Sequence, residues 1–214
     1  SRANVAKVLA ALLAIAACRC HALERAKVAA DALRVAEANL PANGKTFDAF
    51  RERDGINGAD LAARRFATEN DPTCLVLVGQ TGSGKTHLVC AAATLMLQNG
   101  LAVRYEFVPD FLDRLRHTYA DDAEEDLSEL LAWYERRVLL LDDLGVEKAS
   151  EWQRERLGSV IEGRLHHGRK FMVTTNLSYE EMARHLTPRI ASRLFATRGV
   201  NLETVVMTAG DYRR

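Results

Sequence analysis

Short apolar runs alternate with amphipathic segments along most of the chain from about residue 74 onward. The runs consist mainly of apolar residues rather than alternating apolar and polar ones, which is typical of strands buried on both faces. Segments between the runs have apolar residues at helical spacing, as from about Ala149 to His167. Buried strands separated by helices predict an α/β fold with a parallel sheet between two helical layers. The predicted strands are CLVLVG (74–79), LAVRYEFV (101–108), VLLLDDLG (138–145), KFMVTTN (170–176) and LETVVMT (202–208).

The first forty residues follow a different pattern. Residues 5–40 read as one long amphipathic helix, in which apolar residues such as Val28 lie among charges, and Pro41 ends it. We therefore expect a helical segment over residues 1–45 and a domain over residues 46–214. The run VAKVLAALLAIAACRC also resembles a bacterial lipoprotein signal, but its amphipathic continuation favours the helix. Because no run of about 20 uninterrupted apolar residues occurs, we expect no membrane-spanning segment.

The composition narrows the range of partners. The 214 residues include 29 basic and 29 acidic side chains, so the formal net charge is zero. A neutral chain has no overall attraction to nucleic acid or membranes, so any nucleic-acid contact must come from a local basic patch. The cysteines show no pattern of paired disulfides, which favours a reducing compartment and a cytoplasmic location. Cys18, Cys20 and His21 suggest zinc, but a fourth ligand nearby is missing, which argues against such a site.

A glycine-rich turn follows the first predicted strand and precedes a predicted helix. Its sequence, GQTGSGKT, fits the phosphate-binding P-loop, in which backbone N–H groups and the helix N-terminus hold phosphate. Lys85 would add a positive charge for the β- and γ-phosphates, and the Thr86 hydroxyl would bind Mg²⁺. The alternative is a glycine-rich turn that binds nothing. The residues predicted to bind nucleotide here are Gly79, Gln80, Thr81, Gly82, Ser83, Gly84, Lys85, Thr86 and His87.

Two carboxylates follow four apolar residues in the strand VLLLDDLG. Two neighbouring desolvated carboxylates repel each other unless a cation or water lies between them. We expect Asp142 to belong to the magnesium shell and Asp143 to polarise the attacking water, although both could be solvated strand-end residues. In a parallel sheet Asn176 would lie beside them and could hydrogen-bond the γ-phosphate. Asn176 is also an ordinary strand exit, because Ser178 and Glu181 predict a helix cap directly after it.

Two arginines lie four residues apart in the segment RIASRL. Thr187 and Pro188 predict the start of a helix there, which places Arg189 and Arg193 on one face. This pair suits either a surface ridge of ion pairs or a charge offered to the γ-phosphate of a neighbouring subunit.

The motifs GQTGSGKTHL, VLLLDDLG, VTTN, RIASRL and GDYR occur in the order and spacing of a known family. Residues 46–214 resemble the DnaC/IstB-type AAA+ ATPases, and most of all the DnaC/DnaI-type replicative helicase loaders. The resemblance implies a three-layer P-loop AAA+ fold with a reduced lid and an N-terminal helical extension, ATP and Mg²⁺ as cofactors, and head-to-tail assembly into a ring or spiral. It also implies that Arg193 is an arginine finger with Arg189 beside it, that Arg213 is a sensor arginine, and that Phe47 packs near the adenine.

The same resemblance implies contact with single-stranded DNA in a central channel. The corresponding residues are Arg116, Tyr119, Lys148, Ser150 and Trp152, because a basic residue can hold a phosphate while a nearby ring stacks on a base. Tyr119 could equally pack internally and Arg116 be solvated. One departure is that Asp143 stands where many AAA+ enzymes have glutamate, from which we expect slow turnover.

The function implied by the resemblance is that of an ATP-dependent loader, which binds a replicative DNA helicase through its N-terminal helix and delivers it to DNA. That helix could instead pack on its own ATPase domain. The alternatives are an IstB-type transposition helper, which binds duplex DNA and recruits a transposase, and a non-catalytic ATP-dependent binding module.

Overall fold

The computed structural model describes residues 27, 30, 34–41, 44–117, 134–135, 137–145, 150–196 and 201–212. The chain divides into two compact units, residues 1–37 and residues 38–214. In the first unit the described residues, 27, 30 and 34–37, are helical. The second unit contains every strand and helix named below. Within the described ranges, no helix has both the length and the apolar character needed to cross a membrane.

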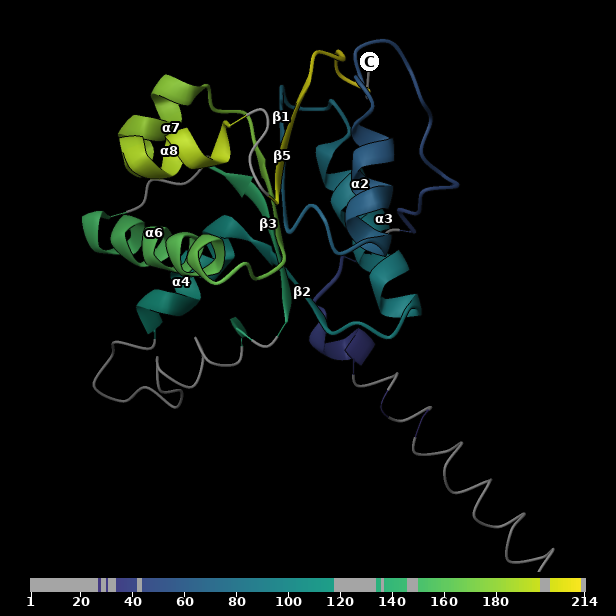
Figure 1. Ribbon diagram of the computed structural model, residues 1–214, viewed down its shortest axis with the longest axis horizontal. Helices are drawn as coiled ribbons and strands as arrows, with labels where there is room; N and C mark the ends of the chain where they lie inside the picture. Colours follow the sequence, from purple (N-terminus) through teal and green to yellow (C-terminus); the bar gives the residue numbers. More distant parts are fainter. Residues whose placement is uncertain are drawn as a thin grey trace, which may run out of the picture. The chain divides into compact units, whose positions relative to one another are not determined.

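A five-stranded sheet forms the centre of the second unit (Figure 1). Its strand order is β2-β3-β4-β1-β5, and all four neighbouring pairs are parallel. This confirms the parallel sheet predicted from the apolar runs, whose central residues are buried in the first four strands but only partly buried in the fifth, at the sheet edge. The strands are β1 (Cys74–Gly79), β2 (Val103–Phe107), β3 (Val138–Leu144), β4 (Phe171–Thr175) and β5 (Leu202–Met207).

Helices cover both faces of this sheet, as the sequence pattern predicts. Figure 1 shows α2 (Ala59–Thr68) and α3 (Lys85–Gln98) on one face. Each helical layer encloses its own cluster of buried apolar side chains against the sheet. The predicted helix starts are also confirmed, because the side chains of Ser178 and Thr187 accept hydrogen bonds from backbone N–H groups of α7 and α8. The helices on the other face are α4 (Val108–His117), α6 (Glu151–His166), α7 (Tyr179–His185) and α8 (Pro188–Leu194).

The carboxyl ends of β1, β3 and β4 meet at one edge of the sheet, because these strands are parallel and β4 lies between the other two. The ladder between β3 and β4 is irregular between Leu141 and Leu144. Within that irregularity Asp143 has a φ of 60°, in the left-handed region. A bulge re-aims side chains that would otherwise alternate regularly, and here it affects both carboxylates predicted to act at the site.

Candidate nucleotide site

The turn between β1 and α3 has a backbone that only glycine adopts readily. Gly82 has a φ of 79° and Gly84 a φ of 104°. There is also no room for side chains, since a Cβ at Gly82 would lie 1.9 Å from Asp211 Oδ1, and one at Gly84 would lie 3.1 Å from the Phe50 ring. The turn leads directly into α3, a helix of 14 residues whose first residue is Lys85. Backbone N–H groups at such a helix start form an anion-binding concavity.

A pocket of about 490 Å³ opens over this turn, within the size range of small-molecule sites. Four basic side chains line it and Asp143 is the acidic residue among its lining, so the pocket suits an anionic ligand. Ser83 Oγ is buried and has no hydrogen-bond partner within the described part of the chain, so a polar ligand would satisfy it. The lining residues are Lys45, Ala49, Phe50, Arg51, Arg53, Thr81, Gly82, Ser83, Gly84, Lys85, Thr86, His87, Asp143 and Tyr212.

Lys85 is held on the inner side of the turn. Its Nζ donates hydrogen bonds of 2.7 Å to the carbonyl oxygen of Gly79 and 2.9 Å to that of Gln80. Burial lowers the pKa of Lys85, and the negative charges of Asp143 and Asp142 oppose that shift. An arriving phosphate would add negative charge and compensate the buried ammonium. Gly79 and Gln80 thus hold the lysine rather than line the pocket.

The two carboxylates of β3 have different environments. Asp142 is 2% exposed, and its Oδ1 and Oδ2 accept hydrogen bonds from Thr174 Oγ1 at 2.6 Å and from Tyr105 Oη at 2.8 Å. Thr174 Oγ1 also accepts a bond of 2.9 Å from the N–H of Asp143. Burial and the Asp142 charge raise the pKa of Tyr105, so its hydroxyl remains a donor. Asp142 is therefore fixed inside the sheet, whereas Asp143 lines the pocket.

Asn176 lies directly after β4 and is exposed. Among the described residues, the pocket wall includes Asp143 but neither Asp142 nor Asn176. The β4 residue that contacts the carboxylates is Thr174, which the sequence analysis did not select. Tyr105 was missed as well. Both residues lie inside predicted strands. A polar side chain within an otherwise apolar strand was the feature of the sequence that could have indicated them.

The phenylalanine that lines the pocket is Phe50 rather than Phe47, so the expectation for Phe47 needs correction. Phe47 is 8% exposed and belongs to the core, where the Arg64 guanidinium carbon lies 4.4 Å from its ring centroid. A turn closed by a 3.2 Å hydrogen bond from Phe50 N to Phe47 O reverses the chain between them. Phe50 then meets the ring of His87 at a centroid distance of 5.2 Å in the pocket wall. His87 Nε2 lies 2.8 Å from Thr46 O.

The C-terminal segment contacts the P-loop from outside. The carbonyl oxygen of Gly82 accepts hydrogen bonds from Tyr212 N at 2.9 Å and from Arg53 Nη2 at 3.0 Å. The Arg53 guanidinium also lies 5.1 Å from the centroid of the Tyr212 ring. Sequence reasoning missed Arg53 and Tyr212, since only folding brings them to the turn. Arg213 lies outside the described residues.

The arginines of α8 are exposed and do not line the pocket of their own chain. Arg189 Nε lies 3.4 Å from Glu162 Oε1, which is the ion-pair arrangement considered in the sequence analysis. Arg193 lies one helical turn further on the same helix.

The residues considered for DNA contact lie on α4 and α6 where they are described. Arg116 is exposed and pairs with Asp113 at 3.2 Å. Ser150 caps α6 by accepting a hydrogen bond from Gln153 N, and the Arg156 guanidinium lies 5.6 Å from the Trp152 ring centroid. Tyr119, Lys148, Cys18, Cys20 and His21 lie outside the described residues.

Comparisons with known proteins show the family and the fold of this chain. The model of a family described as IstB-like ATP binding protein matches residues 9–213. The replicative helicase loader DnaC of Escherichia coli (strain K12) is 27% identical over 154 residues, which cover 70% of this chain and 62% of that protein. The replicative helicase loader DnaI of Bacillus subtilis (strain 168) is 28% identical over 114 residues, 53% of this chain and 36% of that protein.

The aligned part therefore spans less than two thirds of the length of these relatives. A crystal structure of the DnaC helicase loader is similar with a TM-score of 0.65 and 27% identity, covering 77% of this chain and 97% of the other.

Proposed function

Because this chain belongs to the IstB-like ATP binding family of AAA+ ATPases, we propose that it is an ATP-dependent replicative helicase loader. It binds ATP and Mg²⁺, assembles head to tail, contacts single-stranded DNA and delivers a hexameric DNA helicase. The observation that carries the proposal is the pocket of about 490 Å³ in which the P-loop, Lys85 and Asp143 meet. Two relatives at 27% and 28% identity are replicative helicase loaders.

The pocket residues can hold a triphosphate with its metal. The P-loop amides and Ser83 contact phosphate oxygens, and Lys85 neutralises the β- and γ-phosphates. Thr86 and the β3 carboxylates offer the oxygen ligands that Mg²⁺ prefers, and the ion would neutralise phosphate charge. Because Asp142 is buried and does not line the pocket, it would act on waters of the metal shell, while Asp143 would polarise the attacking water.

Further groups complete the site in this proposal. Asn176 contributes an amide to the γ-phosphate from the end of β4. Phe50 and His87 hold the base, since their rings pack against each other in the pocket wall. Arg213 is the sensor arginine of this proposal, and in the sequence it follows Tyr212, whose N–H donates a hydrogen bond to Gly82 O.

Arg193 acts on the pocket of the next subunit, with Arg189 beside it. An exposed arginine on α8 that does not line its own pocket can neutralise a γ-phosphate only in trans. An arginine finger contributes about 10³ to 10⁵ in rate, enough to make hydrolysis depend on assembly. Head-to-tail contacts of this kind produce a ring or an open spiral.

The remaining partners are assigned by position in the chain. Residues 1–45 form the helicase-binding segment ahead of the ATPase domain over residues 46–214. In this proposal single-stranded DNA binds at the exposed ends of α4 and α6, and the interaction takes place in the cytoplasm. Because the net charge of the chain is zero, the DNA contact must rely on a local basic patch. The contact residues are Arg116, Tyr119, Lys148, Ser150 and Trp152.

A second candidate is a transposition helper that binds duplex DNA and recruits a transposase. The matching family is described as IstB-like ATP binding protein, and this description supports the transposition helper as the second candidate.

The deciding experiment measures phosphate release by the purified chain alone, with single-stranded DNA and with duplex DNA, together with transfer of a hexameric helicase onto a single-stranded circle. A loader hydrolyses ATP faster with single strands and transfers the helicase. Stimulation by duplex alone would point to the transposition helper, and the absence of any hydrolysis would indicate a binding module. Lys85→Ala serves as the inactive control.

A further inference from the structure

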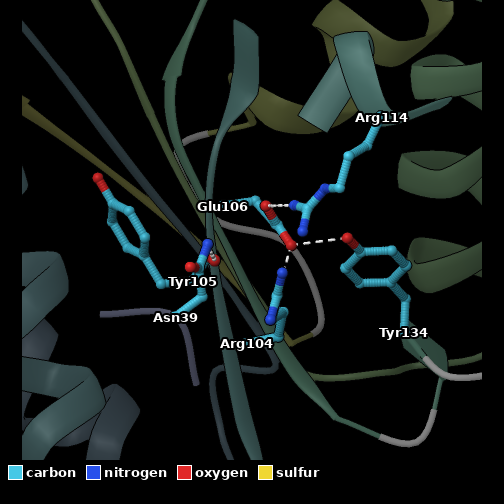
Figure 2. A network of polar contacts seen from close by, with 6 residues as sticks. All are labelled: Asn39, Arg104, Tyr105, Glu106, Arg114 and Tyr134. Atoms are coloured by element: carbon cyan, nitrogen blue, oxygen red, sulfur yellow. Dashed lines mark hydrogen bonds and ion pairs between the residues drawn. The ribbon is translucent and has the colours of Figure 1, made fainter. Parts of the chain in front are cut away.

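Strand β2 carries three consecutive buried polar residues, Arg104, Tyr105 and Glu106 (Figure 2). Successive side chains of a strand point to opposite faces of the sheet. Figure 2 accordingly shows the Tyr105 ring on one side of the strand, and Arg104 and Glu106 on the other. Buried polar groups on an edge strand need hydrogen-bond partners. The partners of Tyr105 lie in two separate parts of the chain.

The side chain of Tyr105 contacts Asp142, the buried carboxylate next to the pocket residue Asp143. Its Oη donates to Asp142 Oδ2 at 2.8 Å, while Thr174 Oγ1 occupies Oδ1 at 2.6 Å. These two hydroxyls, from the strands on either side of β3, fix the orientation of the carboxylate. Removing either one leaves a buried carboxylate oxygen with one donor fewer.

The backbone of Tyr105 binds the residues at which the chain enters the second unit. Its N–H donates to Ala38 O at 2.8 Å, and its carbonyl oxygen accepts a bond of 3.3 Å from Asn39 Nδ2. Asn39 has a φ of 54°, a left-handed conformation that asparagine tolerates better than most residues. Both outward-facing backbone groups of Tyr105 are thus bound by residues 38–39.

The opposite face of β2 is anchored to α4. Glu106 is fully buried and accepts hydrogen bonds from Arg104 and Arg114, and from Tyr134 Oη at 2.6 Å (Figure 2). Because these contacts hold β2 in place as a unit, we expect a displacement of residue 39 to move Tyr105 and its hydroxyl as well.

We infer that Tyr105 is a positioning residue, which orients Asp142 through its hydroxyl and couples that carboxylate to Ala38 and Asn39 through its backbone. The inference rests on the proposed function of the pocket as an ATP and Mg²⁺ site. A change at the junction of residues 38–39 then alters how strongly the site binds Mg²⁺ with its nucleotide.

The first test replaces the hydroxyl alone. Tyr105→Phe and the matched control Tyr134→Phe each remove one buried hydroxyl that donates to a carboxylate, but on opposite faces of the sheet. Binding of a fluorescent ATP analogue is titrated with Mg²⁺, and unfolding is followed in parallel. We expect Tyr105→Phe to raise the Mg²⁺ midpoint about three- to tenfold, as for a lost bond to a charged group, with Mg²⁺-free ADP affinity unchanged. Tyr134→Phe should leave the midpoint unchanged.

The second test probes the coupling. Asn39→Gly retains the left-handed backbone and removes the Nδ2 donor. We expect it to raise the Mg²⁺ midpoint about twofold alone and by nothing further in the Tyr105→Phe background, because both act through one side chain. Effects that simply multiply, or no effect of Asn39→Gly, would refute the coupling.

The outcomes also separate the inference from the function on which it rests. A wild-type chain that binds no nucleotide would overturn both. If the wild-type chain binds nucleotide with Mg²⁺ and Tyr105→Phe has the same Mg²⁺ midpoint, only the positioning role would be overturned. The same conclusion would follow if Tyr134→Phe shifted the midpoint as much as Tyr105→Phe.

Discussion

The Nζ atom of Lys85 donates a 2.7 Å hydrogen bond to the carbonyl oxygen of Gly79, six residues before it at the end of β1. The lysine is thereby held beneath the turn that it closes, with its pKa lowered by burial. At neutral pH this lowered pKa makes the charged lysine a cost to folding, one that fades as the pH rises from the folded pKa towards the unfolded pKa and is absent above it. Bound phosphate would offset that cost.

Lys85→Ala should weaken nucleotide binding about 100-fold, because it removes charge-assisted bonds to two phosphates. The free energy of unfolding without nucleotide should stay within about 1 kcal/mol of wild type, since a buried charge is lost as well. Fluorescent-nucleotide titration and urea denaturation measure the two quantities. Equal ATP affinity in both proteins would contradict the phosphate role.

Arg193→Ala should preserve nucleotide affinity and reduce DNA-stimulated hydrolysis about 10³-fold, because the finger acts on the neighbouring site. Arg189→Ala, which breaks a surface ion pair, is the matched control and should have a smaller effect. Mixing Arg193→Ala with Lys85→Ala subunits should restore part of the activity, since the second supplies the finger to sites of the first. Failure of the mixture to recover activity would exclude action in trans.

Gly82→Ala should destabilise the turn and weaken nucleotide binding. Its Cβ would lie 1.9 Å from Asp211 Oδ1 in addition to the strain at a φ of 79°. Gly100→Ala is the control, because it has a φ of 80° and no atom within 4 Å of the added carbon. The control should lose about 1–2 kcal/mol of unfolding free energy without a change in affinity. Identical behaviour of the two variants would show that the contact with Asp211 is unimportant.

Phe50→Ala should mainly affect nucleotide affinity, whereas Phe47→Ala should mainly affect the free energy of unfolding. Loss of Phe50 removes an aromatic wall of the pocket and should weaken nucleotide binding about three- to tenfold, with a modest effect on stability. Loss of the buried Phe47 should reduce the free energy of unfolding by about 3–5 kcal/mol. If nucleotide affinity falls in Phe47→Ala and not in Phe50→Ala, the base does not pack against Phe50.

Glu106→Gln should reduce the free energy of unfolding by about 3–5 kcal/mol, because it leaves two arginine partners beside a neutral group in a buried network. Glu203→Gln, in the exposed pair with Arg65, should change it by less than about 1 kcal/mol. Urea denaturation of both variants tests the contrast. Comparable losses would mean that burial of Glu106 adds nothing to its contribution.

Much of the fold follows from local patterns. The fully apolar run before the P-loop predicts β1, and Ser178 and Thr187 predict where α7 and α8 begin, because caps and strand burial depend on neighbouring residues. The order β2-β3-β4-β1-β5 is different, since it places β4 between strands that precede it in the chain. That order is what brings Thr174 to Asp142.

The sequence by itself determined the α/β class and the phosphate-binding turn, because each depends on residue types at short, regular spacings, and the resemblance of its motifs to a known family indicated an AAA+ ATPase. Only the tertiary structure decided that Phe50 rather than Phe47 lines the pocket, and that Asp143 lines it while Asp142 stays inside the sheet. It also decided that Tyr105 and Tyr212 belong to the site or contact it. The placements of Asp142, Tyr105 and Tyr212 depend on hydrogen bonds between residues far apart in the chain, and local patterns carry no information about which distant partners folding will bring together.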